Sequence, residues 1–293
     1  MTDQQWLAEH FEQQRPRLRA VAYRMLGSLS EADDAVQEAW LRASRAGTEE
    51  VENLDGWLTT IVARVALNAL RSRNRRREQS LEEYLPDPII DSADGTDPEH
   101  ETLLADSVGL ALLVVLEALT PGERLAFVLH DMFAMPFEEI APIVERSPEA
   151  TRQLASRARR RVRGDVRVPD APLPEQWRVV DAFLAAAREG DFDALLAVLD
   201  PDVVLRADGG VSGLSHHARG AETVARQATM WSRQAALTVR RALINGAAGL
   251  VSERDGTAVS VGAFTVRNGR IVELDFLVDP ERLAKLDLRV LNE

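Results

Sequence analysis

The chain has 293 residues, of which 45% are hydrophobic and 28% are charged, and its formal net charge is −12. This length indicates two or three domains, and this composition can build hydrophobic cores, which argues against a wholly disordered chain. The absence of cysteine excludes disulfides, thiolate nucleophiles, iron–sulfur clusters and zinc fingers, and five scattered histidines offer little for a metal site. We therefore expect no cofactor and no metal.

No apolar run reaches the length of a bilayer-crossing helix, and the first fifteen residues are polar, without the apolar stretch of a signal peptide. We expect a cytoplasmic protein with no membrane partner.

The negative net charge argues against nucleic-acid binding, because phosphates are contacted by lysine and arginine. The charge is unevenly distributed, however. Residues 84–107 contain seven acids and no lysine or arginine, whereas five arginines lie in residues 71–77 and six in residues 152–163. Two such local concentrations of arginine are typical of nucleic-acid contacts despite the negative total.

Apolar residues from Trp6 to about Glu83 recur at spacings of three and four, which predicts an all-helical domain in residues 1–83. Residues 84–107 contain three prolines, one glycine and many acids, which predicts an extended acidic linker. Helical periodicity returns in residues 108–168, and a further group of prolines follows. This pattern predicts a second, smaller helical domain.

Within this second domain the sequence predicts a helix-turn-helix. Apolar residues from Phe137 to Val144 indicate a short helix, Glu145 to Ser147 a turn, and Ser147–Pro148–Glu149 the start of the next helix. In this next helix four apolar residues recur every four positions and are expected to pack inward: Ala150, Leu154, Ala158 and Val162. Such a helix can enter the major groove of DNA.

The other face of this helix is polar and rich in arginine, so we expect base contacts near its start and phosphate contacts near its end. The candidate DNA-binding residues are Ser147, Glu149, Arg152, Gln153, Ser156, Arg157, Arg159, Arg160, Arg161 and Arg163. Of these, the base-reading residues are Arg152, Gln153, Ser156 and Arg157, and the later arginines hold phosphates. The same pattern also fits a helical hairpin whose arginine face is only solvated.

Residues 169–293 change texture and predict an α+β domain. The expected helices are residues 176–189, 192–199 and 221–232, and the expected strands are 203–207, 236–244, 250–253, 258–266 and 271–278. An Asn268–Gly269 pair predicts a tight hairpin turn between the last two strands.

Two runs, SEADDAVQEAWLRASR (Ser30–Arg45) and DGWLTTIVARVALNALRSRNRRR (Asp55–Arg77), followed by the helix-turn-helix, resemble regions 2 and 4 of bacterial extracytoplasmic-function (ECF) sigma factors. The resemblance covers roughly residues 5–165. It implies an alternative sigma factor that binds core RNA polymerase and directs −35/−10 promoter recognition and transcription initiation. The linker would then thread a positively charged channel of the polymerase.

The resemblance also implies roles for individual residues. An acidic helix would dock on the β′ clamp helices of the polymerase, which is contacted through its β subunit as well; its residues are Asp33, Asp34, Gln37, Glu38 and Leu41. The helix of residues 57–77, with the loop 46–55, would melt and hold the −10 element; its residues are Trp57, Arg64, Asn68, Arg71, Arg73, Arg75 and Arg76. Trp57 and Asn68 also fit core positions.

The order of elements in residues 169–293 resembles a SnoaL-like, NTF2-type cone, an extension carried by sigma factors of the SigJ type. Three short motifs resemble signatures of that subgroup: Tyr84–Leu85–Pro86, Asp208–Gly209–Gly210 and Asp279–Pro280–Glu281–Arg282–Leu283. There the extension replaces a separate anti-sigma protein and packs against region 2 and the linker. The implied regulatory residues are Asp208, Gly209, Gly210, Asp279, Pro280 and Leu283. We expect the segments 208–213 and 279–286 to hold the sigma regions in an arrangement unsuited to promoter binding.

Two alternatives remain open. The same cone serves enzymes, and its pocket candidates are Trp177, Asp181, Asp208, His216, His217, Trp231 and Asp275. No spacing among them indicates catalysis. His216 and His217 also fit a surface loop, and Asp275 also fits a solvent-facing position. A DNA-binding regulator whose cone binds a small molecule without catalysis is therefore favoured over an enzyme. The other alternative is a repressor that binds duplex operator DNA without polymerase, but it does not explain the pattern in residues 30–77.

Overall fold

The structure is a computed structural model that describes residues 3–48, 51–77, 85–93, 95, 109–165, 170–210, 215–234 and 237–291, without the side chains of residues 3, 74–77, 109, 165, 233, 234 and 290. The described residues form two compact units. The first contains those of residues 1–81 and 113–166, and the second those of residues 82–97, 107–112 and 167–293.

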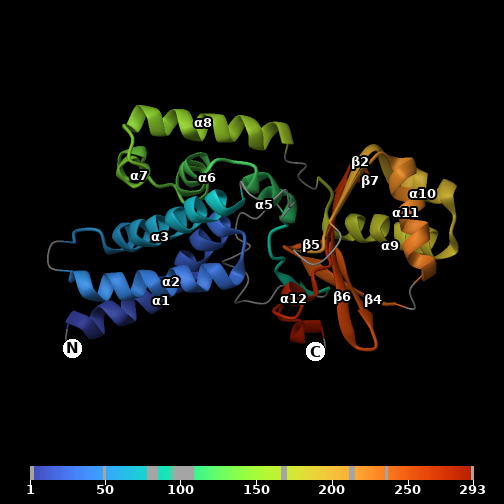
Figure 1. Cartoon of the computed structure of the whole chain (residues 1–293), viewed down its shortest axis with the longest axis horizontal. Helices are drawn as coiled ribbons and strands as arrows, with labels where there is room; N and C mark the ends of the chain where they lie inside the picture. The colour runs from blue at the N-terminus through green and yellow to red at the C-terminus, as the bar shows by residue number, and fades with distance from the viewer. Residues whose placement is uncertain are drawn as a thin grey trace. The chain divides into compact units, whose positions relative to one another are not determined.

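The first unit begins with three packed helices: α1 (Asp3–Leu26), α2 (Leu29–Ala46) and α3 (Leu54–Arg77) (Figure 1). Their apolar residues form a core in which Phe11 and Leu18 of α1 and Leu58 of α3 are almost fully buried. The Ser28 hydroxyl accepts a hydrogen bond from the Glu31 amide and caps the start of α2. The helical domain predicted from three-and-four spacing is confirmed.

The unit continues with the part of α5 (Gly109–Glu117) from residue 113 onward, and then with α6 (Pro121–Phe127), the π-helical turn η1 (Val128–Met132), α7 (Phe137–Val144) and α8 (Pro148–Asp165). Thr120 and Glu123 form a capping box at the start of α6. Helix α8 packs across α6 and α7 (Figure 1).

The predicted helix-turn-helix is confirmed. Its turn contains Glu145 in the left-handed conformation, with φ 58° and ψ 47°, where a glycine is more usual. The Ser147 hydroxyl accepts a hydrogen bond from the Ala150 amide at 3.2 Å and caps α8. The buried seam of α8 differs from the predicted one: Thr151, Ala155 and Ala158 are fully buried, whereas Ala150, Leu154 and Val162 are only half-buried.

The second unit contains a seven-stranded sheet with the order β1-β4-β5-β6-β7-β2-β3. The strands are β1 (Ile90–Ser92), β2 (Leu199–Asp208), β3 (His216–Arg219), β4 (Thr238–Ile244), β5 (Ala247–Arg254), β6 (Thr257–Arg267) and β7 (Arg270–Leu277). Strands β2 and β7 are parallel, and the other neighbours are antiparallel. The predicted Asn268–Gly269 turn joins β6 to β7 with positive φ at both residues.

Helices α9 (Leu173–Glu189), α10 (Phe192–Val198) and α11 (Ala221–Gln234) lie on one face of this sheet (Figure 1). The core between them includes Phe183 of α9 and Phe264 of β6, whose rings meet edge to face. Two short helices, α12 (Pro280–Leu283) and η2 (Arg289–Leu291), follow the sheet. The α+β cone predicted for this part of the chain is confirmed, although β3 and α12 were not predicted.

Part of the predicted linker packs on the second unit, as the resemblance implies, and it does so as a strand, which was not predicted. Part of it joins the sheet as edge strand β1, where Ile90 pairs with Ile244 and Ser92 with Ala242 of β4. Leu85, Ile89 and Ile90 are almost fully buried. Prolines and acids dominate the composition of this segment, but its few apolar residues are sufficient to dock on the exposed edge of β4.

Candidate nucleic-acid interface and linker-binding site

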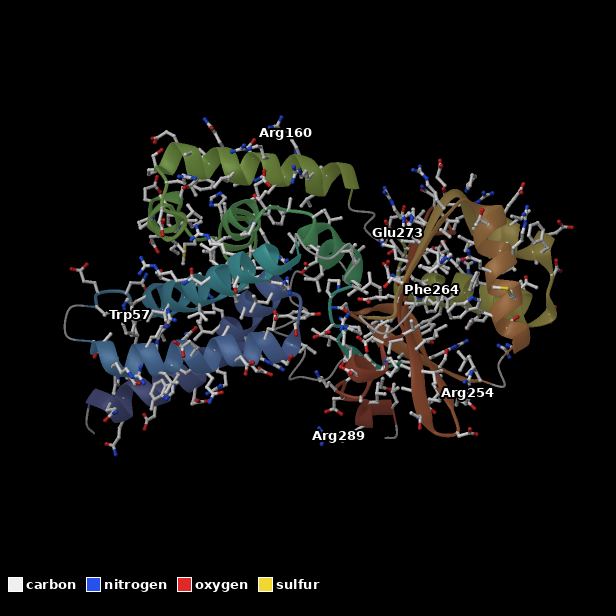
Figure 2. The ribbon with its side chains drawn as sticks, viewed as in Figure 1. Trp57, Arg160, Arg254, Phe264, Glu273 and Arg289 are labelled. Atoms are coloured by element: carbon white, nitrogen blue, oxygen red, sulfur yellow. The ribbon has the colours of Figure 1, made fainter. Side chains whose placement is uncertain are left out.

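Helix α8 presents an exposed polar face, as the sequence predicts. Its exposed candidate residues are Glu149, Arg152, Gln153, Ser156, Arg157, Arg160, Arg161 and Arg163, while Arg159 is half-buried and Ser147 lies exposed at the cap. Within the described part of the chain, Arg160 and Arg163 have no side-chain partner. Arg160 projects from the outer side of the helix (Figure 2).

Other arginines of α8 already contact acids of the same unit. Arg161 lies 3.2 Å and Arg157 3.9 Å from the buried carboxylate of Glu123. On the opposite edge Arg159 is bonded to Asp131 at 2.6 Å, and Arg152 lies 3.4 Å from Glu138 and 5.2 Å above the Phe137 ring. Arginine side chains held by neighbours in this way are pre-oriented along the helix surface.

Helix α3 brings several predicted −10 residues onto one face. Trp57, Arg64, Asn68 and Arg71 are spaced by seven, four and three residues, which corresponds to one side of an α-helix. Arg64 and Asn68 are exposed, and Arg71 is half-buried, 4.0 Å from Glu145. Because Asn68 is exposed, it does not occupy the core position that the sequence also allowed. The side chains of Arg75 and Arg76 lie outside the described part of the structure.

Trp57 lies half-buried at the start of α3 (Figure 2). It lines a hollow of about 820 Å³ together with the end of α2 and the loop that follows; the other lining residues are Ser44, Arg45, Ala46, Gly47, Val51, Glu52 and Asn53. An aromatic wall beside arginine and asparagine donors is a suitable receptor for an unstacked base.

Arg73 is placed differently from the other arginines of α3. It is largely buried and donates hydrogen bonds to the Leu26 carbonyl at 2.8 Å and to Glu117 at 3.1 Å. Glu117 also accepts a hydrogen bond at 2.8 Å from Arg124, which is buried on α6 and donates to the Arg24 carbonyl at 3.0 Å. The side chains of Arg73, Glu117 and Arg124 thus join α3 and α1 to α5 and α6, the helices that precede the helix-turn-helix.

The predicted polymerase-binding residues lie on α2. Asp34, Gln37 and Leu41 follow helical spacing along one exposed face, with Glu38 beside them and Leu41 41% exposed. Asp33 lies to one side of this face and is paired with Arg19 of α1 at 2.6 Å. An exposed leucine between acidic and amide side chains is a suitable contact for a basic partner surface.

The second unit contains a site that holds the linker, centred on Asp208 at the end of β2. Asp208 is 3% exposed, and its Oδ2 atom accepts hydrogen bonds from the Leu85 amide at 2.8 Å and from Arg282 at 2.7 Å. Its Oδ1 atom accepts a hydrogen bond from the Gly210 amide at 2.9 Å, which orients the carboxylate. These three hydrogen bonds hold the carboxylate in one orientation.

Arg282 of α12 completes this site. Its guanidinium donates to Asp87 and to the Leu85 carbonyl, each at 2.6 Å, in addition to Asp208. Arg282 was not among the predicted regulatory residues. The sequence does contain a signal for it. Arg282 is the only basic residue of its motif, and the linker has seven acids and no lysine or arginine.

The predicted motif residues shape this site. Asp279 accepts hydrogen bonds from the Glu281 and Arg282 amides at 2.9 and 3.4 Å, which starts α12 at Pro280 and positions Arg282. Gly210 has φ 67°, and a Cβ atom there would lie 2.1 Å from the Asp279 carboxylate, so glycine is required. Leu283 of α12 is buried, and so is Gly209, which follows Asp208. Tyr84 and residues 211–213 lie outside the described residues.

The contacts with the linker continue beyond Asp87. The Ile89 amide donates to the Asn245 side chain at 3.2 Å, and the Asn245 amide donates to the Ile89 carbonyl at 2.8 Å. Strand β1 follows directly. We call the set Leu85, Asp87, Ile89, Asn245, Asp208 and Arg282 the linker clamp.

The residues weighed for an enzymatic site do not come together. His216 and Trp231 line a cavity of about 280 Å³, whereas Trp177, Asp181, Asp208, His217 and Asp275 do not. Asp181 pairs with Arg241 on the surface, and no carboxylate is among the described residues that line the cavity.

Two expectations about these residues are wrong. His216 and His217 lie on β3 rather than in a loop, because β3 extends the sheet beside β2. Asp275 is 2% exposed rather than solvent-facing and is bonded to Arg206 at 2.7 Å. Burial raises the pKa of Asp275, and Arg206 partly opposes this effect.

Across the residues that the structure describes, no helix is long and apolar enough to cross a membrane. The same residues contain no group of acids and histidines that could hold a metal ion.

Two segments of the chain match known families. Residues 10–76 match Sigma-70 region 2, and residues 109–162 match Sigma-70, region 4. Together with the helix-turn-helix and the α3 face, these matches define the class of protein: a promoter-recognition subunit of the sigma-70 type.

Relatives with both regions and the C-terminal domain are known. The chain is 36% identical to the ECF RNA polymerase sigma factor SigJ of Mycobacterium tuberculosis, over 95% of this chain and 94% of that protein. It is 35% identical to a probable ECF sigma factor SigI of the same species, over 93% of each chain. The crystal structure of M. tuberculosis SigJ superposes with a TM-score of 0.76 and 33% identity, over 96% of this chain and 99% of that one.

The chain belongs to the ECF RNA polymerase sigma factors. It binds core RNA polymerase and recognises promoter DNA, as a subunit of the transcription machinery. The repressor alternative does not account for the region 2 match.

Proposed function

We propose that the C-terminal domain restrains this sigma factor by holding the linker between regions 2 and 4 in the linker clamp. The observation that carries the proposal is the continuous set of contacts from Leu85 to Ser92, which includes the largely buried ion pair of Arg282 with Asp87 and the pairing of β1 with β4. A linker that forms an edge strand of a sheet cannot at the same time lie extended in a channel of the polymerase. Clamped and released linkers are therefore two alternative states.

The balance between these states sets the activity. Release of the linker takes the Leu85 amide away from Asp208 and the Asp87 carboxylate away from Arg282, which costs free energy because these groups are largely buried. Polymerase binding must offset this cost, and a signal that weakens the clamp would increase the active fraction.

For DNA, we assign the −35 element to α8 and the −10 element to α3. The exposed Arg152, Gln153 and Ser156 face base edges, and Arg160 and Arg163 hold phosphates, because neither of the latter has an acidic partner within the described residues. The hollow beside Trp57 receives an unstacked −10 base, and Arg64, Asn68 and Arg71 follow the strand. The α2 face with Asp34, Gln37, Glu38 and Leu41 contacts the β′ clamp helices.

Run-off transcription from a pooled genomic promoter library, with bacterial core polymerase, tests this function. Transcripts with a shared upstream motif are expected only when the protein is present. Their yield is expected to rise with Arg282→Ala, and also with a chain that ends at Arg167, because either change releases the linker. Arg267→Ala, at an exposed site away from the clamp, is the matched control.

No polymerase-dependent transcripts would contradict the sigma function itself. Transcripts whose yield is unchanged or lowered by Arg282→Ala would contradict the restraining role of the clamp and leave the sigma function intact.

A further inference from the structure

The cavity of about 280 Å³ in the C-terminal domain lies between the sheet and helices α9 and α11. The sheet side of the cavity is a row of residues that pair with one another on five adjacent strands. In order across the sheet they are Leu250, Gly262, Phe276, Ala207 and His216. Phe183 and Ala187 of α9 and Ala228 and Trp231 of α11 line the opposite side.

Gly262 determines the shape of this floor. A Cβ atom at Gly262 would lie 2.5 Å from the ring of Phe276, so the ring lies across the glycine. The Phe276 ring also meets Phe264 edge to face, with centroids 6.0 Å apart. The ring is thereby held against the sheet, and the space above it stays open.

Two serine hydroxyls face this space without partners among the described residues. Ser252 of β5 and Ser260 of β6 pair directly across the two strands, line the cavity and are 5% and 8% exposed. Among the described residues, neither hydroxyl has a hydrogen-bond partner. An apolar occupant would cover both hydroxyls without giving them a partner, which costs free energy, so this pair favours an occupant that supplies a polar group.

The remaining lining decides the charge of the occupant. It is mostly apolar and includes no carboxylate among its described residues, and its charged group, Arg188, is exposed. The imidazole of His216, also exposed, lies 2.6 Å from the Gln227 amide nitrogen. Trp231 and Val239 are 53% and 41% exposed, so apolar side chains border the opening. A charge placed beside the two serines would be desolvated without a counter-ion.

We propose that this cavity binds a neutral, mainly apolar small molecule that carries a hydroxyl or carbonyl group bonded to Ser252 and Ser260. At about 30 Å³ for each water-sized volume, the cavity has room for roughly ten non-hydrogen atoms. Ala207 lines the cavity and the next residue, Asp208, belongs to the linker clamp, so the occupant would lie one residue from the clamp. An effect of the ligand on transcription rests on the proposed function, whereas binding does not.

Isothermal titration of the full-length protein without polymerase tests binding. The probes are three compounds of similar size: 1-naphthol, naphthalene, which lacks a polar group, and 1-naphthoate, which is charged. We expect 1-naphthol to bind about tenfold more tightly than naphthalene, as one or two hydrogen bonds allow, and 1-naphthoate to bind more weakly than both.

The variant Ser252→Ala/Ser260→Ala is expected to bind 1-naphthol about tenfold more weakly and naphthalene unchanged, a difference that misfolding would not produce. Its unfolding midpoint should not fall, because neither hydroxyl has a hydrogen-bond partner among the described residues to lose. Ala228→Phe fills the cavity and should abolish binding of both compounds, whereas Thr223→Phe, exposed on the same helix, should not.

Absence of saturable 1-naphthol binding would overturn the proposal. Equal binding by the serine variant, equal binding of 1-naphthoate, or binding retained in Ala228→Phe would do the same. None of these results bears on promoter-directed transcription, which the run-off assay measures separately.

Discussion

The position of each arginine on α3 separates two roles. Arg73 lies sixteen residues after Trp57, which at 100° per residue corresponds to the opposite side of the helix, and there it bonds to Glu117. Arg64 lies on the exposed face with Trp57. Arg73 is therefore a structural residue in this conformation, whereas Arg64 is available to nucleic acid.

Arg73→Ala is expected to lower the free energy of unfolding of the first unit by about 2 kcal/mol, because it removes one partner of a largely buried ion pair. Arg64→Ala should change it by less than about 0.5 kcal/mol and should instead weaken promoter opening by the holoenzyme. Urea unfolding followed by circular dichroism, with permanganate footprinting of the promoter, checks both variants. A stable Arg73→Ala protein with the opening defect of Arg64→Ala would contradict this division.

Asp275 gives the second unit a dependence on pH. An acid whose pKa is higher in the folded than in the unfolded chain binds a proton more tightly when folded. Protonated Asp275 therefore stabilises the fold, fully so below the ordinary aspartate pKa of 3.8. This stabilisation is lost as the pH rises through the raised pKa of the folded protein. We therefore expect the unfolding free energy of the unmodified protein, relative to Asp275→Asn, to decrease as the pH rises above about 4.

Urea unfolding at several pH values measures this difference, with the exposed Asp193→Asn as a control. A difference between the unmodified protein and Asp275→Asn that rises with pH would mean that Arg206 outweighs burial at this site.

At the scale of elements, we propose that α8 combines base contacts and phosphate contacts along one helix. Arg152 lies near the helix start, supported by Glu138 and Phe137, and Arg160 lies two turns later with no partner in the described part of the chain. A base contact affects one sequence position, whereas a phosphate contact affects all sequences through counter-ion release.

Arg152→Ala is expected to cost about 1–3 kcal/mol of discrimination at one −35 position. Arg160→Ala should weaken binding to all promoters alike and reduce the slope of log K against log salt by about one. Gel-shift titrations with holoenzyme at several salt concentrations distinguish the two effects. Arg254→Ala, exposed on β5 (Figure 2), should leave both quantities unchanged; indistinguishable behaviour of Arg152→Ala and Arg160→Ala would count against the assignment.

At the scale of the whole molecule, the linker is the segment that connects the two DNA-binding regions in the chain and is also part of the C-terminal sheet. In the proposed function, holding the linker restrains both regions together, without any change in the residues that touch DNA. This arrangement requires only one two-state element, the linker clamp.

Arg282→Ala is expected to speed hydrogen exchange of the Leu85 amide at least tenfold, because Asp208 loses the charge that holds it in place beside that amide. The Ile89 amide should follow to a smaller extent, since Asn245 still accepts its hydrogen bond. Hydrogen exchange with mass spectrometry of the full-length protein measures both segments, with Arg267→Ala as control. Unchanged protection at Leu85 would show that Arg282 does not hold the linker.

The sequence by itself determined the helical domains, the helix-turn-helix and the order of most strands. These depend on local patterns: three-and-four spacing in α1 to α3, Ser147 and Pro148 at the start of α8, and Asn268–Gly269 between β6 and β7. A rotation of about 100° per residue also places Trp57, Arg64 and Asn68 on one face of α3. The same rotation places Arg73 on the opposite face, so its different position could have been predicted.

Only the tertiary structure decided which residues meet across long distances in the chain. Leu85 and Asp208 are 123 residues apart, and Arg282 and Asp87 are 195 residues apart, so no local period connects them. The docking of β1, the burial of Asp275 and the pairing of Ser252 with Ser260 above Gly262 depend on strand order and register, which are set by the packing of the whole sheet rather than by any one segment.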